Sequence, residues 1–291
     1  MNKVKEFIKL LRVHQWIKNV FIFSPMIFSK NFFNTEDWRK ILLTFMGFSL
    51  VASSSYVLND IVDREKDRLH PVKKNRPIAS GKISVLEAVF LFIFLFLIGV
   101  YISYSVDKGV ALFTLSYFFL ILLYSLFLKR MVFIDMITIA IGFDIRALVG
   151  AYAIRVELSS WLVIDLFLLA LFLAATKRRQ ELIKLKDADK HKKVLSYYSL
   201  SMIDQIIPIL TSTTLISYII YTLSPKVSTY FGTEYFYLTV PFVVYGIFRY
   251  LYIIYNKDTF GDPTYLLIHD WPLILDIILW GISIIALIYL Y

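Results

Sequence analysis

The feature that most constrains the fold is a series of long apolar runs. Nine such runs follow one another along the chain, and each is close to the ~20 residues that a helix needs to cross a bilayer. They lie at about 16–33, 38–62, 85–105, 109–128, 131–154, 158–176, 203–223, 235–255 and 272–291. With 58% hydrophobic residues, the chain is too apolar for a water-soluble domain. We therefore predict an all-α integral membrane protein with nine transmembrane helices, forming one domain over residues 1–291.

The basic residues predict how these spans are oriented. With the N-terminus in the cytosol, 24 of the 31 Lys and Arg residues fall in inner segments and 6 in outer segments. Cytosolic segments carry such an excess, so we expect the N-terminus in the cytosol and the C-terminus outside, in the cytoplasmic membrane. An amphipathic helix over about 3–12 is expected to lie on the cytosolic leaflet. Two basic loops, about 63–84 and 177–202, would face the same compartment.

The composition excludes several kinds of site. The chain has no cysteine, which excludes disulfides, thiol catalysis and cysteine-ligated metals. Its net charge of +9 resides in segments between apolar spans. Membrane lipids and phosphorylated substrates are therefore expected as partners, and nucleic acid is not. The sequence leaves the oligomeric state open, and a homo-oligomer is compatible with it.

Polar residues repeat every four positions at the end of the second predicted span. Asn59, Asp63 and Asp67 would share one face of a helix, with Asp60 on its flank. Oxygen ligands of this kind suit Mg²⁺, with Mn²⁺ as an alternative. Cations surround the stripe: Arg64, Lys66, Arg68, Lys73, Lys74, Arg76 and Lys82. Carboxylates beside many cations suit a site for a metal and a polyphosphate, although a solvated helix end with mixed charges has the same composition.

A second charged cluster begins where the sixth predicted span ends. Lys177 and Glu181 are four residues apart, and Arg178 lies next to them. Lys177 and Arg178 are equally compatible with phosphate binding and with a cytosolic anchor.

Polar residues within the apolar spans form further candidates. Asp135 and Arg146 are three helical turns apart at nearly the same angle, and they either line a cavity or form interhelical ion pairs. Lys129 precedes them at the cytosolic edge. Gln15 and Asn19 are four residues apart where the first span begins, and together with Lys18 they are candidates to line the site.

Two of these segments match a known family. Asn59-Asp60-x-x-Asp63-x-x-x-Asp67, followed by Arg76-Pro77-Ile78-Ala79-Ser80-Gly81, resembles the first aspartate motif and loop of the UbiA superfamily of membrane prenyltransferases. The resemblance implies a nine-helix bundle that binds Mg²⁺-diphosphate at its cytosolic end and opens laterally to lipid.

The chain departs from the usual superfamily pattern at the end of the sixth span. The second motif of the superfamily, Asp-x-x-x-Asp, is replaced by Lys177-Arg178-Arg179-Gln180-Glu181. This departure is similar to the branch of phosphoribosyltransferases that act on decaprenyl phosphate. Two other segments resemble that branch: an N-terminal cluster of Arg12, Gln15, Trp16, Lys18 and Asn19, and the segment from Pro263 through Asp270.

The resemblance implies a function and a role for each residue. The reaction would be Mg²⁺-dependent transfer of a 5-phosphoribosyl group from phosphoribosyl diphosphate to a polyprenyl phosphate, for cell wall biosynthesis. Metal ligands would be Asn59, Asp60, Asp63 and Asp67, and catalytic residues would be Asp63, Asp67 and Lys177. Substrate would be bound by Gln15, Lys18, Asn19, Arg64, Lys73, Lys74, Arg76, Lys129, Arg146, Arg178 and Glu181.

Two other functions are compatible with the sequence. A conventional UbiA prenyltransferase would move a polyprenyl group from its diphosphate to an aromatic or other small acceptor, and the replaced second motif counts against it. A lipid-phosphate carrier or transporter would use Asp135 and Arg146 as gating charges, but the chain has no evident internal repeat of the kind that transporters often contain.

Overall fold

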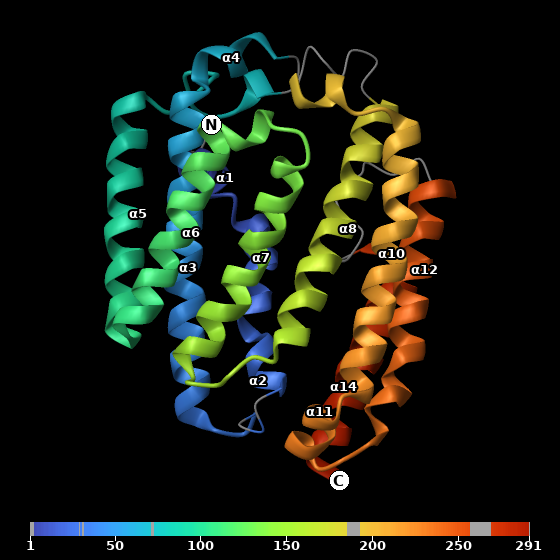
Figure 1. Ribbon diagram of the computed structural model, residues 1–291. Helices are drawn as coiled ribbons and strands as arrows, with labels where there is room; N and C mark the ends of the chain where they lie inside the picture. Colours follow the sequence, from blue (N-terminus) through green and yellow to red (C-terminus); the bar gives the residue numbers. More distant parts are fainter. Residues whose placement is uncertain are drawn as a thin grey trace. The chain divides into compact units, whose positions relative to one another are not determined.

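The computed structural model describes residues 3–28, 30, 32–70, 73–184, 193–256 and 269–290. This part of the chain is helical and contains no strand (Figure 1). Seven helices are long and apolar enough to cross a membrane, so the prediction of an all-α, multi-pass membrane protein is confirmed. They are α3 (Thr35–Val62), α5 (Val85–Val106), α6 (Lys108–Leu126), α8 (Ser160–Lys184), α10 (Leu200–Leu223), α12 (Val240–Asn256) with the 3₁₀ helix η5 (Tyr235–Thr239) before it, and α14 (Trp271–Leu290).

Two of the nine predicted spans differ from this description. The first is not one α-helix but a 3₁₀ helix, η1 (Val13–Phe23), followed by the short α2 (Ser24–Phe28). Because a 3₁₀ helix rises about 2.0 Å per residue, the two together could extend about 30 Å. The other is α7 (Ile134–Ala153), which has 20 residues but carries three charged side chains. The count of nine spans and the orientation of the termini stay predictions.

The chain divides into two compact units. The first comprises Met1–Ser24, Asn34–Lys129 and Ile145–Val156, and the second comprises Pro25–Phe33, Arg130–Asp144 and Glu157–Tyr291. The boundary falls inside α7, whose first half belongs to the second unit and whose second half belongs to the first.

The first unit is built on a close contact between α3 and α5. A Cβ atom added at Gly99 would lie 2.7 Å from the carbonyl oxygen of Gly47, so a side chain at this crossing would clash with backbone. Small residues allow membrane helices to approach in this way. The start of α5 is fixed by Ser84 and Glu87, which form the reciprocal capping box that their spacing predicts.

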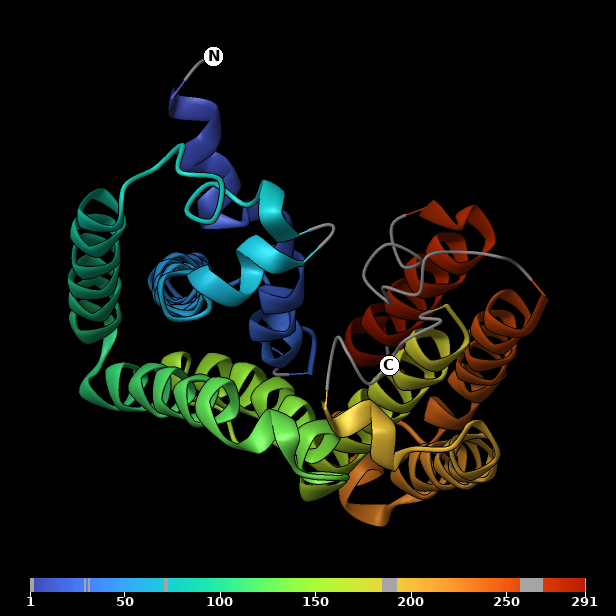
Figure 2. The same ribbon diagram turned by 90° about the horizontal axis from the view of Figure 1, so that it is seen from above.

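A short amphipathic helix and a polar turn complete the first unit. The predicted helix over 3–12 is α1 (Lys3–Leu11), whose Leu10 is buried beside Val57 and Ile78. After α3, the chain forms α4 (Arg64–Leu69) and the 3₁₀ helix η2 (Lys73–Asn75). In Figure 2, α3 is seen nearly along its axis while α4 lies across its end. This turn carries most of the candidate site.

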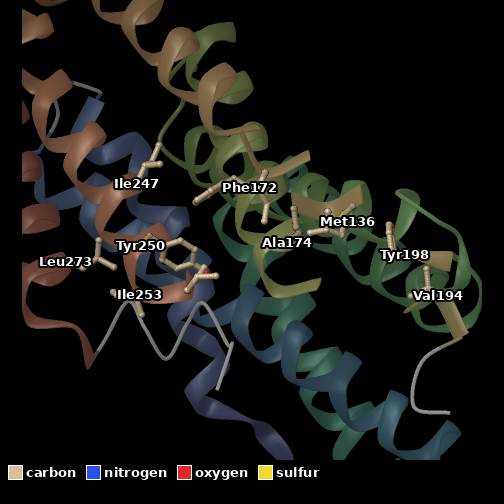
Figure 3. Close-up of a cluster of buried hydrophobic side chains, with 13 residues drawn as sticks. Met136, Phe172, Ala174, Val194, Tyr198, Ile247, Tyr250, Ile253 and Leu273 are labelled. Carbon is tan, nitrogen blue, oxygen red and sulfur yellow. The ribbon is translucent and has the colours of Figure 1, made fainter. Parts of the chain in front are cut away.

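The second unit packs α8, α10, α12 and α14 around an apolar core. The core includes Phe172, Ile203, Tyr250 and Leu273 (Figure 3). The predicted loop over 177–202 begins too early, because α8 continues to Lys184. The sequence after residue 176 is rich in Lys, Arg, Gln and Glu, which are good helix formers, so apolar content ends before the helix does. The 3₁₀ helix η4 (Lys193–Tyr197) precedes α10, and α11 (Pro225–Phe231) follows it.

Candidate active site

The polar stripe of residues 59–67 lies on two helices. The backbone N–H of Asp63 donates to the Asn59 carbonyl oxygen at 2.9 Å, and that of Asp67 donates to the Asp63 carbonyl oxygen at 2.8 Å. The four-residue repeat is therefore kept in the hydrogen bonding, but α3 ends at Val62 and Asp63 joins it to α4 with φ −86° and ψ 4°. The expectation of a single helical face is wrong, because the chain changes direction at Asp63.

Two of the three carboxylates are held by arginines. Arg76 Nη1 donates to Asp60 Oδ1 at 2.8 Å and to Asp67 Oδ2 at 2.7 Å, so one guanidinium bridges two buried acids. Arg12 Nη2 also donates to Asp60 Oδ1, at 2.6 Å. Arg12 has a left-handed backbone with φ 51°, which is uncommon for a residue with a side chain. This turn between α1 and η1 places its guanidinium at Asp60 and 5.2 Å from the Tyr56 ring.

Lysines lie beside Asp63 and Asp67. Lys129 Nζ donates to Asp63 Oδ2 at 3.3 Å, and Lys73 Nζ lies 4.0 Å from Asp67 Oδ1. Burial lowers the pKa of the Lys73 ammonium, and the neighbouring Arg76 guanidinium lowers it further. The other predicted cations of this segment are peripheral: Lys74 is exposed, and Arg64 Nε lies 3.4 Å from Glu65 Oε1 of its own helix. Hereafter Asp60, Asp63 and Asp67 are called the acidic cluster.

The acidic cluster fits Mg²⁺ in its chemistry. With Asn59 it offers only oxygen ligands, which hard divalent cations prefer. In the part of the chain that the structure describes, no group of three or more His, Cys, Asp or Glu side chains is arranged to hold a metal ion. The carboxylates instead accept hydrogen bonds from Arg12, Arg76 and Lys129. A metal would therefore compete with these cations for the same oxygens.

The N-terminal candidates lie on η1 and do not share one face as predicted. A 3₁₀ helix has three residues per turn, so Gln15 aligns with Lys18 and not with Asn19. Asn19 is buried, and its Nδ2 donates to Ser49 Oγ at 2.9 Å. Trp16 Nε1 similarly donates to Ser53 Oγ at 2.9 Å. These bonds attach η1 to α3, while Gln15 and Lys18 are half-buried.

Arg146 is a buried part of the first unit and is not a partner of Asp135. Its Nε donates to Asn19 Oδ1 at 2.8 Å and its Nη2 donates to Tyr117 Oη at 2.7 Å. The guanidinium carbon also lies 4.6 Å from the Tyr117 ring centroid and 5.7 Å from that of Phe48. Asp135 belongs to the second unit, where it accepts from Arg178 Nε at 2.8 Å. Of the two possibilities for Asp135, the interhelical ion pair is the one that the structure contains.

The charged run 176–181 of α8, called the basic run below, is tied to its neighbours at nearly every position. Arg178 is buried, and besides Asp135 it bonds to Glu181. Arg179 Nε donates to Asp204 Oδ1 at 2.6 Å, and its guanidinium carbon lies 3.9 Å from the Tyr255 ring centroid.

The amide and hydroxyl of the basic run are also bonded. Gln180 Nε2 donates to the Ile254 carbonyl oxygen at 2.8 Å, and Thr176 Oγ1 donates to the Leu173 carbonyl oxygen at 3.0 Å. Lys177 is half-buried and, among the described residues, forms no hydrogen bond or ion pair. It is thus the one polar side chain of the run without a protein partner.

Sequence reasoning missed several residues around these clusters. Tyr198, whose Oη donates to Asp135 Oδ1 at 2.8 Å, follows no periodic pattern in a chain with 20 tyrosines, so no signal marked it. The serines at 53–55 did carry a signal, since three hydroxyls in an apolar helix need partners. The predicted segment from Pro263 to Asp270 lies mostly outside the described residues, although Asp270 accepts from Arg249 Nη2 at 3.0 Å.

Comparison with known proteins identifies the family of the chain. The profile of the UbiA prenyltransferase family matches residues 26–269. The chain is 30% identical to the decaprenyl-phosphate phosphoribosyltransferase of Corynebacterium glutamicum, over 99% of this chain and 88% of that protein. It is 33% identical to y4nM, an uncharacterized protein of Sinorhizobium fredii, over 62% of this chain. The chain spans only 35% of the length of y4nM.

A solved structure shows the same fold. The UbiA homologue from Archaeoglobus fulgidus bound to DMAPP and Mg²⁺ has a TM-score of 0.73 to this chain, at 17% sequence identity. The match covers 97% of this chain and 99% of that chain.

Proposed function

Because the chain belongs to the UbiA prenyltransferase family, we propose that it is a membrane transferase, and that it moves a 5-phosphoribosyl group from phosphoribosyl diphosphate to a polyprenyl phosphate. Pyrophosphate is the other product. The two units act as one transferase domain over residues 1–291. The site faces the cytosol, where the water-soluble donor is present, and the chain lies in the cytoplasmic membrane.

The basic run is the observation that carries this proposal. A second pair of metal-binding carboxylates suits a prenyl diphosphate donor, and at this place the chain has Lys177, Arg178 and Glu181. Among the described residues, Lys177 is a cation without a partner, which suits a second phosphorylated substrate. The name of the Corynebacterium glutamicum relative supports the same donor and acceptor.

The first unit would bind the diphosphate of the donor. Asn59, Asp60, Asp63 and Asp67 would hold Mg²⁺, which when bound neutralises charge on the pyrophosphate leaving group. Arg76, Lys73 and Lys129 already lie within reach of the acidic cluster. If these cations were released from the carboxylates, they would bind the phosphates of the donor.

The reaction needs no strong general base. The bond between ribose C1 and the pyrophosphate oxygen breaks, and its electron pair leaves with pyrophosphate. An oxygen of the lipid phosphate forms the new bond to C1. That oxygen is already ionised near neutral pH, so the task of the protein is to orient two anions and to stabilise the leaving group.

A transfer assay tests the proposal. Purified protein in detergent receives decaprenyl phosphate, Mg²⁺ and labelled phosphoribosyl diphosphate. We expect label in the lipid phase, and we expect EDTA or Asp63→Ala to remove it. Glu65→Ala is the matched control, because Glu65 is an exposed acid two residues from Asp63 that pairs with Arg68.

A conventional prenyl transfer is the second candidate, favoured by the structure of the Archaeoglobus fulgidus homologue with DMAPP and Mg²⁺. A parallel reaction with a prenyl diphosphate and 4-hydroxybenzoate measures it. Prenylation of the aromatic acid without ribosyl transfer would overturn the phosphoribosyl proposal. Activity in neither reaction would direct attention to a lipid-phosphate carrier.

A further inference from the structure

The basic run is held by a buried network that sequence analysis did not find. Arg178 and Asp135 have side chains that are 3% and 0% exposed, and Arg178 Nε lies 2.8 Å from Asp135 Oδ2. The other carboxylate oxygen of Asp135 accepts from Tyr198 Oη at 2.8 Å. Both oxygens of Asp135 are therefore satisfied by groups on two other segments, α8 and the turn before α10.

Tyr198 joins this network to the backbone before α7. The N–H of Phe133 donates to Tyr198 Oη at 2.6 Å, and the two rings meet edge to face with centroids 5.7 Å apart. Phe133 has φ 64°, a left-handed conformation that is strained for a bulky residue and needs support from its surroundings. Tyr198 lies beside Val194 and Met136 in the apolar core (Figure 3). Its hydroxyl is thus fixed by packing as well as by hydrogen bonds.

The network determines which cation of the basic run is available. Arg178 is occupied by Asp135 and Glu181, and a buried guanidinium that loses a carboxylate partner is costly. Arg179 is occupied by Asp204 and by the Tyr255 ring. Lys177 lies between Thr176 and Arg178 and has no partner in the described part of the chain. A substrate phosphate can therefore be bound by Lys177 without breaking an internal ion pair.

We propose that Asp135, Tyr198 and Arg178 are positioning residues that fix the end of α8 and thereby hold Lys177 for a substrate phosphate. This inference rests on the proposed function and reassigns Arg178, which sequence reasoning placed among the substrate-binding residues. Lys177 then binds phosphate directly, and Tyr198 acts only through the helix that carries Lys177.

A double-mutant cycle tests this division of roles. The four proteins are the wild type, Lys177→Ala, Tyr198→Phe and the double variant, each assayed for KM and kcat with both phosphorylated substrates. Tyr198→Phe removes the hydroxyl and keeps the ring in the core. Tyr255→Phe is the matched control, because it removes a hydroxyl that donates to Asp204 at 3.2 Å and leaves the Arg178 network intact.

We expect the effects of Lys177→Ala and Tyr198→Phe to be strongly coupled. Lys177→Ala should lower kcat/KM by about 10- to 100-fold through a higher KM, as expected for a lost hydrogen bond to a charged group, and Lys177→Arg should restore most of it. Tyr198→Phe should lower kcat/KM several-fold in the wild type and have little effect in Lys177→Ala. Residues that act through one another are non-additive in this way.

Other outcomes would overturn the inference. Equal losses from Tyr198→Phe in both backgrounds would mean that the network supports only the fold, and an unchanged KM in Lys177→Ala would mean that Lys177 binds no phosphate. Equilibrium binding of decaprenyl phosphate and of phosphoribosyl diphosphate to the same four proteins gives the coupling without turnover. If the wild type transfers no ribosyl group, the proposed function fails, and the binding data still decide the roles of Lys177 and Tyr198.

Discussion

The acidic cluster and the basic run each carry several charges, but the protein holds these charges in different ways. The carboxylates at the end of α3 are paired with Arg12, Arg76, Lys73 and Lys129, which come from turns and helix ends and are 23–38% exposed. In the basic run, Arg178 and Arg179 are paired with carboxylates of the packed helices α7 and α10, and the Arg178–Asp135 pair is nearly inaccessible to solvent. The first set can exchange partners, whereas the buried Arg178–Asp135 pair cannot do so without a large loss of stability.

This difference suggests that the acidic cluster changes its contacts when ligand binds, whereas the buried pairs of the basic run maintain the structure. Partly exposed cations regain water when they leave a carboxylate, whereas the buried carboxylates of Asp60 and Asp67 would need a bound metal in their place. Buried pairs have no such replacement. The acidic cluster is therefore suited to change on ligand binding, and the basic run is suited to present one fixed cation.

The largest expected effect tests the buried side of this comparison. Asp135→Asn should lower the free energy of unfolding by about 3 kcal/mol, because it removes the fully buried carboxylate of the Arg178 guanidinium and leaves the partly exposed Glu181. Thermal unfolding in detergent measures the change. Asp204→Asn, which affects the more exposed pair with Arg179, should cost no more than about 1 kcal/mol. Equal losses in the two variants would remove the distinction between the pairs.

A smaller effect tests the exchange of partners at the acidic cluster. Mg²⁺ with inorganic pyrophosphate should stabilise the wild type, by about 2.7 kcal/mol at a concentration 100 times Kd. Asp63→Ala should lose most of this stabilisation, and Glu65→Ala should keep it. The same thermal unfolding assay, with and without ligand, gives both values. A ligand-induced shift of equal size in Asp63→Ala would contradict the assignment of Asp63.

A substitution at Lys129 should weaken substrate binding and leave the free energy of unfolding nearly unchanged. Its pair with Asp63 is 3.3 Å long and partly exposed, so Lys129→Gln should change the free energy of unfolding by less than about 1 kcal/mol. The KM of the Lys129→Gln variant for phosphoribosyl diphosphate should rise about tenfold, since one charge-assisted contact to phosphate is lost. Arg130→Gln removes the adjacent, exposed cation and serves as the control. A normal KM in Lys129→Gln would exclude it from the donor site.

The smallest effect is expected from an exposed ion pair, and it serves as the reference for the other variants. Glu36 and Arg39 form an i,i+3 pair at the start of α3, and both side chains are more than half exposed. Such pairs are screened by solvent and contribute little, so Arg39→Gln should change neither thermal unfolding nor turnover measurably. A clear loss in this variant would show that exposed charges matter more in this protein than the comparison assumes.

The apolar spans and the acidic motif could be predicted from the sequence because each rests on local pattern. Length and hydrophobicity indicate α3, α5 and α6 almost residue by residue. The 3₁₀ conformation of η1 could not be predicted, since its apolar content is equally compatible with an α-helix. The partners of the charged residues were also out of reach. Asp135 pairs with Arg178 of α8, and Arg146 pairs with Asn19 and Tyr117. These partners depend on which helices pack against α7, and helical periodicity does not predict that packing.

The glycine contact between α3 and α5 bears on how the protein reaches the membrane. The helix α3 carries serines and two aspartates that a bilayer receives poorly, and the next apolar helix, α5, is nearly uninterrupted in its apolar sequence. Since Gly47 and Gly99 let the two backbones touch, the pair can enter the lipid as one helical hairpin. A bulky residue at either glycine would separate the hairpin during synthesis, before any site exists. Changes there should be seen as missing protein in the cell and not as a slower enzyme.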